Sequence, residues 1–435
     1  MHSQSETKLT NRILIGLALG LLAAIITLLA GKAVPGLLEF ARNLATQVLD
    51  PFSQIFLRLL FFVVLPLVFC SLTSGMLHLG ELRHLGPLAA RTFTLFALNM
   101  SIAVLLGLLM MNTLQPGGQL DAGTQTRLMT EYGSATQGHI SRHAEAPAMN
   151  LNTLVDMFMP RNLFGAFIGN SRSTLGDVLP LILFALLVGA AGLNLSESKR
   201  QRLHAGLDMV NELMTGIVHF ALKLAPYAVP ALIYSAVVKL GFDIVIALGL
   251  FVLGCMTMLL LHLFGTMSLW LKLWTLRSPL EFFNTIKPVI VTAFSTSSSS
   301  ATLPAALTLA RDRLHIRPST AGFVLPLGTT MNMSGTALYE GCVVLFIAQV
   351  FGVDLGLLQQ LTLLGLSVLS AVAVASIPGG SLPLIAGLLV SFNIPPEGIG
   401  IILGVDRLLD MTRTMVNVGC DLVTCAVVDG KDKPV

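Results

Sequence analysis

The chain has 435 residues, of which 54% are hydrophobic and only 11% charged, and its mean hydropathy is +0.80. Soluble domains carry roughly 25% charged residues, so this composition excludes an ordinary soluble protein and indicates a chain with many membrane spans. The net charge of +3 is small and no basic block is interleaved with aromatic residues, so we expect no nucleic-acid partner.

Long runs without charged residues divide the chain into candidate membrane spans. About 20 apolar residues suffice to cross a bilayer, and Ile13–Gly31 is the first such run. Within it, Gly16 and Gly20 have the G-x-x-x-G spacing of a close helix contact. The later runs are Leu59–Gly80, Thr92–Leu120, Val178–Ser196, Ile244–Leu271, Pro288–Ala310, Pro318–Tyr339 and Leu355–Pro396. The polar stretch Gln115–Asn150 is typical of an extramembrane loop.

Three apolar segments are interrupted in ways that an ordinary spanning helix does not tolerate. The serine run in Ala293–Pro304 cannot simply face lipid, because its hydroxyls and any unwound backbone need partners. If the basic residues of 272–277 and 311–317 share one side of the membrane, this segment enters and leaves by the same face, as a re-entrant hairpin does. Pro-Gly-Gly within Ala371–Pro383 predicts a second hairpin, and Pro326–Glu340 predicts a locally unwound helix whose carbonyls can hold a cation.

The segment Ile401–Val428 has the composition of a membrane helix except for Asp410, Arg413, Asn417 and Asp421. Spacings of three, four and four place these groups on nearly one helical face. A charge at bilayer depth costs about 2.5–3.5 kcal/mol on insertion scales, so such residues usually face a cavity. An arginine flanked by carboxylates therefore predicts a site for a charged solute and cations.

Together, the motifs SSSSATLP, NMSGTALYE and DMTRTMVNVGCD resemble those of the dicarboxylate/amino acid:cation symporter family, which includes the glutamate transporters. The resemblance is dense from Pro279 to Val428 and looser before that. It implies an all-α polytopic membrane protein with eight transmembrane helices plus two re-entrant helical hairpins, inverted repeats and elevator-type movement. It also implies a homotrimer in the lipid bilayer. We expect the cytoplasmic (inner) membrane of a prokaryote, with both termini in the cytoplasm.

The resemblance also implies a division of the chain into a scaffold and a transport unit. The expected parts are scaffold helices 1 and 2 (1–86), transport-unit helix 3 (87–114), an extramembrane loop (115–150), scaffold helices 4 and 5 (151–240), and a transport core of helix 6, hairpin 1, helix 7, hairpin 2 and helix 8 (241–435).

The family pattern implies roles for the substrate-binding residues. Arg413 resembles the residue that holds the side-chain carboxylate of the substrate, since a planar guanidinium suits bidentate binding, and Asp410 resembles the partner of its amino group. The other implied substrate-binding residues are Asn417, Thr414, Thr336, Ser298, Ser299 and Pro378. Having both Arg413 and Asp410 favours L-aspartate or L-glutamate over a neutral amino acid or a plain C4-dicarboxylate. The alternative is a mutual Arg413–Asp410 ion pair that only stabilises the helix bundle.

The resemblance further implies two sodium sites and no organic cofactor. The first would be formed by Asp421, Asn417, Gly328 and Asn332. The second would be formed by backbone oxygens near Thr330 and at Ala371, Val372 and Val374.

A third sodium site of relatives is expected to be degenerate in this chain. Relatives with the motif NMDG carry a carboxylate where this chain has Ser334, and the third-helix positions that supply a phenol and two hydroxyls are Phe96, Asn99 and Met100 here. Sodium prefers hard oxygen ligands, so we expect transport with fewer sodium ions.

Other modes of coupling and other protein classes stay open at this point. Glu340 lies within an apolar segment, and burial favours its protonated form, so it is a candidate proton site. A proton-coupled, weakly coupled or uncoupled carrier of a dicarboxylate or amino acid is the alternative. A hydrolase with Ser298 or Ser299 as nucleophile would need a nearby base, yet no His follows His315 and no G-x-S-x-G motif occurs. A channel is disfavoured by the paired hairpins, and we expect Asp406–Arg407 to tune folding or helix position.

Overall fold

The computed structural model describes residues 2–34, 36–81, 86–120, 159, 161–164, 178–374 and 379–430. Within these ranges the regular elements are all helices, and no strand occurs. The all-α prediction is therefore confirmed for this part of the chain. Pro378, residues 121–150 of the expected extramembrane loop and most of 151–177 lie outside the described residues.

The described helices fall into two groups along the chain. The first group is α1 (His2–Ala30), α2 (Leu37–Leu44), η1 (Ala45–Leu49), α3 (Asp50–Phe62), α4 (Val64–Glu81), α5 (Gly86–Leu114), η3 (Pro116–Gln119), α9 (Val178–Gly192) and α10 (Glu197–Leu240). The second group is α11 (Phe242–Leu261), η4 (His262–Thr266), α12 (Met267–Trp274), α13 (Pro279–Thr296), α14 (Ser299–Asp312), α15 (Pro318–Met331), α16 (Ser334–Val350), α17 (Leu357–Ala373), α18 (Leu382–Ser391), η5 (Pro396–Gly398) and α19 (Ile399–Asp429).

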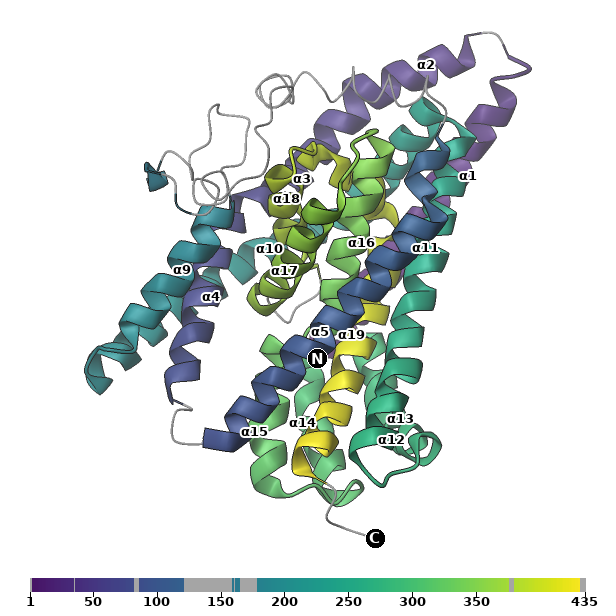
Figure 1. Ribbon diagram of the computed structural model, residues 1–435. Coiled ribbons are helices and arrows are strands. Elements are labelled where there is room, and N and C mark those ends of the chain that lie inside the picture. The colour runs from purple at the N-terminus through teal and green to yellow at the C-terminus, as the bar shows by residue number, and fades with distance from the viewer. Residues whose placement is uncertain are drawn as a thin grey trace.

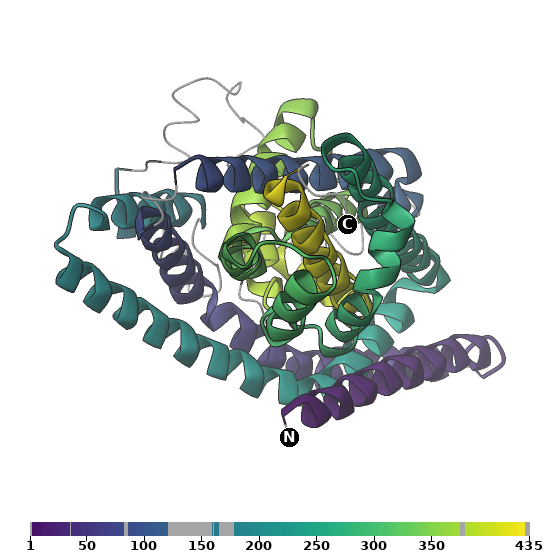
Figure 2. The ribbon, with the colours of Figure 1, turned by 90° about the horizontal axis from the view of Figure 1, so that it is seen from below.

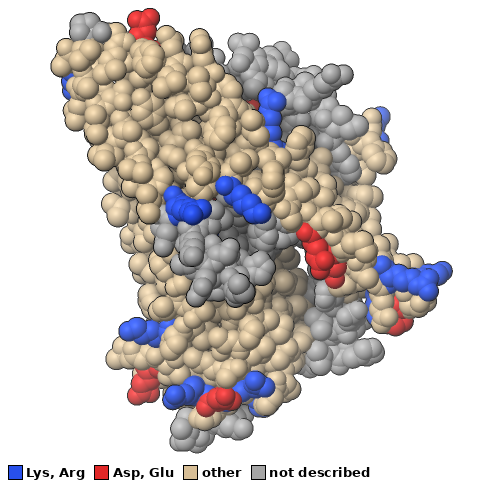
Figure 3. Space-filling view, turned by 180° about the vertical axis from the view of Figure 1, so that it is seen from behind, with Lys and Arg blue, Asp and Glu red and all other residues tan. Residues whose placement is uncertain are grey.

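The surface and the helix lengths are those of a membrane protein. Three described helical runs are long and apolar enough to cross a bilayer, namely Leu88–Gln119, Phe242–Trp274 and Pro318–Val350. The bent helix α10 adds a fourth if its two halves count as one span. Large apolar side chains face outward, such as Leu19, whose exposed fraction is 60%. Among the described residues on the face in Figure 3, charged side chains occur at only a few places, which suits contact with lipid.

The C-terminal helix α19 runs through the centre of the molecule. It packs against α13, α14, α15 and α16, and the views in Figure 1 and Figure 2 place it among these helices. On the outer side α1 packs along α10, and α5 packs along α16. Every residue of α16 except Gln349 is buried, whereas α1 keeps an exposed apolar face. The polar groups of α19 are thereby placed in the best-shielded part of the protein.

The contact between α1 and α10 depends on small residues. Gly16 and Gly20 lie against Pro226 and Pro230 of α10, and a Cβ added at Gly20 would lie 2.6 Å from the Pro230 carbonyl oxygen. Small residues let two helix backbones approach closely in a membrane, where packing rather than hydrophobicity drives association. The helix contact expected from the G-x-x-x-G spacing is therefore present.

The start of the expected extramembrane loop is partly packed against α16. Pro116 and Gly117 of η3 are buried, and the Gly117 N–H donates to Gln349 Oε1 at 3.2 Å. Gln349 Nε2 in turn donates to the Met111 carbonyl oxygen at 3.0 Å, so one side chain of α16 holds the end of α5 and the turn after it.

Replacing Gly20 with alanine should destabilise the protein, because the new Cβ meets backbone atoms of α10. We expect a loss of about 1–3 kcal/mol, the usual range for overpacking, measured as a lower melting temperature of the detergent-purified protein. Gly249→Ala is the matched control, because no atom lies within 4 Å of its added Cβ. Equal melting temperatures for the two variants would contradict the contact.

Candidate functional site

Three helix interruptions meet beside the middle of α19. The break between α13 and α14 lies at Ser297, which has a left-handed φ of 52°, and at Ser298, whose Oγ accepts a hydrogen bond from Ala301 N at 3.2 Å. Asn332 and Met333 separate α15 from α16. The third break separates α17 from α18 and includes Gly379 and Gly380. The interruptions predicted from the serine run, the asparagine segment and the Pro-Gly-Gly segment are therefore all present.

A small cavity opens where these breaks face α19. Its lining comes from Ser297, Ser299, Met333, Thr336, Val374, Gly380, Ser381, Asp410, Thr414 and Asn417. It leaves about 20 Å³ for the centres of water-sized molecules, which is the space of about one water. A larger solute can bind there only if lining side chains move.

The lining includes the N-terminal ends of three helices. Ser299 begins α14, Thr336 lies in the first turn of α16, and Ser381 directly precedes α18. Helix N-termini present unpaired backbone N–H groups and about half a positive charge each, so they stabilise anions. The backbone of the cavity is therefore suited to carboxylate groups.

Arg413 is the most deeply buried cation of the site, with an exposed fraction of 1%. Its Nη2 donates to Asp410 Oδ1 at 2.8 Å and to Asp406 Oδ1 at 3.2 Å, and its Nη1 donates to Ser381 Oγ at 3.0 Å. The Arg413–Asp410 ion pair that the sequence left as an alternative is thus present. Because Ser381 and Asp410 both line the cavity, the guanidinium lies directly behind its wall.

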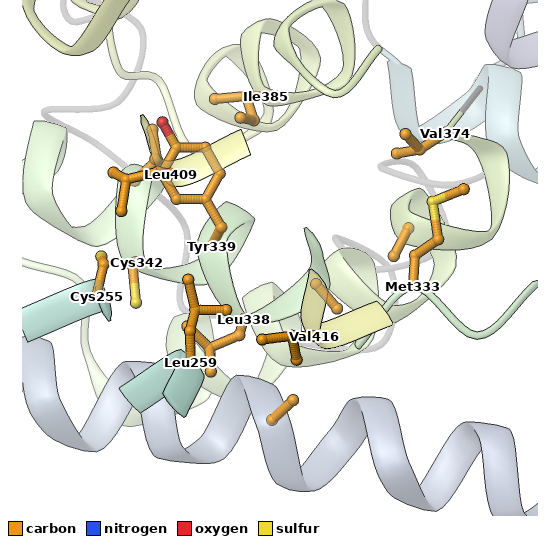
Figure 4. Packing of buried hydrophobic residues seen from close by; sticks show 14 of the residues in the cluster. Cys255, Leu259, Met333, Leu338, Tyr339, Cys342, Val374, Ile385, Leu409 and Val416 are labelled. Atoms are coloured by element: carbon orange, nitrogen blue, oxygen red, sulfur yellow. The ribbon is translucent and has the colours of Figure 1, made fainter. Parts of the chain in front are cut away.

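Asp406, Tyr339 and Ser381 complete the surroundings of Arg413 and were not predicted as site residues. The Tyr339 hydroxyl donates to Asp406 Oδ1 at 2.9 Å, and the Arg413 guanidinium carbon lies 4.0 Å from the centre of the Tyr339 ring. Figure 4 shows this ring packed with Leu409, and Met333 and Val374 together on another side of the view. The spacing of seven residues from Asp406 to Arg413 puts both on one helix face and could have revealed the first of them.

The other predicted substrate-binding side chains lie close to the same cavity. Asn417 Oδ1 accepts from the Gly335 N–H at 2.8 Å, and Asn417 Nδ2 donates to Thr336 Oγ1 at 3.1 Å, so α19 caps the start of α16. Thr414 lines the cavity, while its hydroxyl donates to the Asp410 carbonyl oxygen. Ser299 lines the cavity directly, and Ser298, beside it, is buried. Pro378 lies outside the described residues.

Asp421 and its neighbours form a buried acidic site below the cavity. Asn332 Nδ2 donates to Asp421 Oδ1 at 2.9 Å, and a Cβ added at Gly328 would lie 2.7 Å from Asp421 Cγ. Among the described residues, no Lys, Arg or His forms an ion pair with Asp421. A buried carboxylate without a countercharge is costly, and a bound cation would remove that cost. Three of the four residues predicted for the first sodium site are therefore in contact, and Asn417 lies one turn away on α19.

The residues predicted for the second sodium site lie at two helix ends. Thr330 is in the last turn of α15, Ala371 and Val372 are in the last turn of α17, and the two helices contact each other. Val374 follows the end of α17. The last carbonyls of a helix lack intrahelical partners and carry partial negative charge, which suits a cation.

The residues of the predicted degenerate third site are buried, and one of them, Asn99, is hydrogen-bonded through Asn332 to Asp421. Phe96 and Met100 of α5 and Ser334 of α16 are buried. Asn99 Nδ2 donates to Asn332 Oδ1 at 2.8 Å, and Asn332 Nδ2 donates to Asp421. The side-chain oxygen of Asn332 therefore accepts a hydrogen bond from the Asn99 amide.

Glu340 is fully buried one residue after Tyr339 and packs near Ser370 of α17. Within the described part of the chain, neither of its carboxyl oxygens has a hydrogen-bond partner of good geometry.

Comparisons with known proteins find relatives along most of this chain. The profile of the sodium:dicarboxylate symporter family matches residues 9–431. The proton/sodium-glutamate symport protein of Bacillus caldotenax is 30% identical over 407 residues, covering 94% of this chain and 90% of that protein. The proton/glutamate-aspartate symporter of Escherichia coli is 28% identical, covering 86% and 83%. The C4-dicarboxylate transport protein of Deinococcus radiodurans is 29% identical, covering 85% and 80%.

Replacing Gly328 with alanine should disturb the acidic site, since the added Cβ meets the Asp421 carboxylate. We expect a loss of about 1–3 kcal/mol in stability, read as a lower melting temperature. Gly322→Ala on the same helix is the control, because nothing lies within 4 Å of its added Cβ. If the two variants have the same melting temperature, Gly328 and Asp421 are not in contact.

Proposed function

The chain belongs to the sodium:dicarboxylate symporter family, and on that premise we propose that it imports an acidic amino acid, L-aspartate or L-glutamate, by alternating access. It is a membrane transport protein and not an enzyme. The observation that carries the substrate assignment is the buried guanidinium of Arg413 behind a cavity lined by three helix N-termini. Both features favour carboxylate groups.

Recognition requires Arg413 to exchange partners. In the structure its donors are directed to Asp406, Asp410 and Ser381. The side-chain carboxylate of the substrate would take over part of these hydrogen bonds, and Asp410, partly released, would receive the substrate's ammonium group. The α-carboxylate would lie near Ser298, Ser299 and Asn417 at the starts of α14 and α16, with Thr336 and Thr414 beside it. A one-methylene difference is worth only about 1–3 kcal/mol, so aspartate and glutamate are both retained.

Cations would balance the negative charge that enters with the substrate. Asp421 and Asn332, with backbone oxygen from Gly328 and the amide oxygen of Asn417, would hold one sodium ion, which neutralises the Asp421 carboxylate when bound. The ends of α15 and α17, at Thr330 and at Ala371, Val372 and Val374, would hold a second. An anion that moves alone against 100 mV faces about 2.3 kcal/mol, or about fifty-fold exclusion, so inward transport needs at least one co-transported cation.

The third sodium site of relatives would be absent. Phe96 and Met100 offer no hard oxygen ligand, and Ser334 offers a neutral hydroxyl where relatives carry a carboxylate. Glu340 is the candidate proton carrier, since it is buried without a hydrogen-bond partner in the described part of the chain. Two relatives are named as proton/sodium-glutamate and proton/glutamate-aspartate symporters, and both names are compatible with proton coupling here.

From membership of the family we also infer the topology and the oligomeric state of the protein. Eight spans with two re-entrant hairpins would form a homotrimer in the cytoplasmic membrane of a prokaryote, with both termini inside. The parts 1–86 and 151–240 would be the scaffold, and 87–114 with 241–435 would move as one body.

Replacing Arg413 with cysteine should abolish uptake of acidic amino acids. Hydrogen bonds to charged groups contribute about 1.5–3 kcal/mol each, so loss of two should weaken L-aspartate binding at least about 100-fold, measured in proteoliposomes. Because the change leaves Asp406 and Asp410 with one partner fewer, melting temperature is checked and Arg413→Lys serves as a second variant that keeps the charge. Preserved aspartate affinity in a folded variant would overturn the role of Arg413.

The sodium dependence of L-aspartate binding should be shallower than for three ions. Restoring oxygen ligands with Phe96→Tyr, Asn99→Thr, Met100→Ser and Ser334→Asp together should steepen it, because these changes rebuild the third site. Asp421→Asn is the opposite control and should flatten the response by removing the carboxylate of the first site. A three-ion dependence in the unmodified protein would show that the third site is intact.

A further inference from the structure

Two arginines share the carboxylate of Asp410. Arg413 Nη2 donates to Asp410 Oδ1 at 2.8 Å, and Arg407 Nη1 donates to Asp410 Oδ2 at 3.2 Å. The Gly379 N–H also points at Oδ2, at 3.4 Å. The side chains of Arg407 and Asp410 are only 12% and 10% exposed, so solvent screens this pair weakly.

Arg407 makes the wall of the cavity electrically neutral. The two carboxylates of Asp406 and Asp410 face the two guanidinium groups of Arg407 and Arg413, all on α19. Without Arg407 this group would carry one excess negative charge beside a cavity that must receive carboxylates. From the sequence we expected Arg407 to tune folding or helix position, but its contact with a cavity-lining carboxylate gives it an influence on the ligand.

The contact bears on which anions the cavity accepts. An acidic amino acid offers an ammonium group to Asp410, whereas a C4-dicarboxylate has none and would be repelled by an unpaired carboxylate. In this chain both oxygens of Asp410 already receive guanidinium hydrogen bonds, so that repulsion is offset. We propose that Arg407 sets substrate specificity through Asp410, and that it lets the site bind C4-dicarboxylates without an amino group in addition to acidic amino acids.

This inference rests on the proposed function, and its geometry makes Arg407 a positioning residue. Arg407 does not line the cavity, so a direct hydrogen bond to the ligand is not expected. Its effect should depend on whether the ligand carries an ammonium group. A merely structural role would weaken both classes of ligand alike.

The test compares the binding of succinate and L-aspartate to the full-length protein in detergent, by calorimetry or by displacement of labelled L-aspartate. The unmodified protein should bind both. In Arg407→Gln the dissociation constant of succinate should rise at least about 10-fold, and that of L-aspartate less than about 3-fold. Arg407→Lys should restore the ratio of the two dissociation constants to within about 3-fold of the original. These thresholds correspond to about 1.4 and 0.7 kcal/mol.

Two further variants keep the test decisive. Arg311→Gln, an exposed arginine of α14 that bonds to its own helix, should change neither dissociation constant. Arg407→Gln combined with Asp410→Asn should bind succinate at least about 10-fold more tightly than Arg407→Gln alone, because the uncompensated carboxylate is gone. The combined variant also replaces the single one if the latter does not fold.

Several results would overturn the inference. The inference fails if the unmodified protein binds L-aspartate but not succinate. It also fails if Arg407→Gln changes both dissociation constants equally, or if Arg407→Lys does not restore their ratio. Each of these results leaves the proposed function in place. Binding of neither ligand by the unmodified protein would instead reject the proposed function itself.

Discussion

The buried guanidinium of Arg413 is the constraint to which the rest of the site is fitted. A cation with 1% exposure in an apolar helix bundle persists only if partners replace its hydration. Asp406, Asp410, Ser381 and the face of the Tyr339 ring supply those partners here. Because the partners come from α16, α19 and the start of α18, holding one charge also holds three elements together. A carboxylate ligand that replaces some of them necessarily changes how these elements are bound.

The helix interruptions solve a second problem, which is how to present polar backbone inside a membrane protein. The starts of α14, α16 and α18 line one cavity, and the last carbonyls of α15 and α17 lie at neighbouring helix ends. Broken helices thus offer positive ends to an anion and negative ends to cations without adding ionised side chains. Asn417 lines the cavity and lies one helical turn from Asp421 on α19, so a ligand in the cavity and a cation at Asp421 would influence each other.

Much of the site could be predicted from the sequence because it depends on local chemistry. Serine, asparagine and Pro-Gly-Gly segments mark the three breaks, and helical spacing places Asp410, Arg413, Asn417 and Asp421 on one face. The partners of Arg413 from other helices could not be predicted this way. Tyr339 and Ser381 reach it only through packing, and the hydrogen bond of Asn99 depends on the register of α5 against the α15–α16 break. Likewise, the sequence does not show that Arg407 and Arg413 both bind the carboxylate of Asp410, because this depends on the side-chain conformations.

The most direct test is an experimental structure of the full-length protein with saturating L-aspartate and sodium. The account predicts that Arg413 nitrogens lie within about 3.2 Å of the oxygens of the ligand's side-chain carboxylate, with at least one of its hydrogen bonds to Asp406 or Asp410 released. A structure in which Arg413 keeps both of these carboxylates while the ligand is bound elsewhere would contradict it.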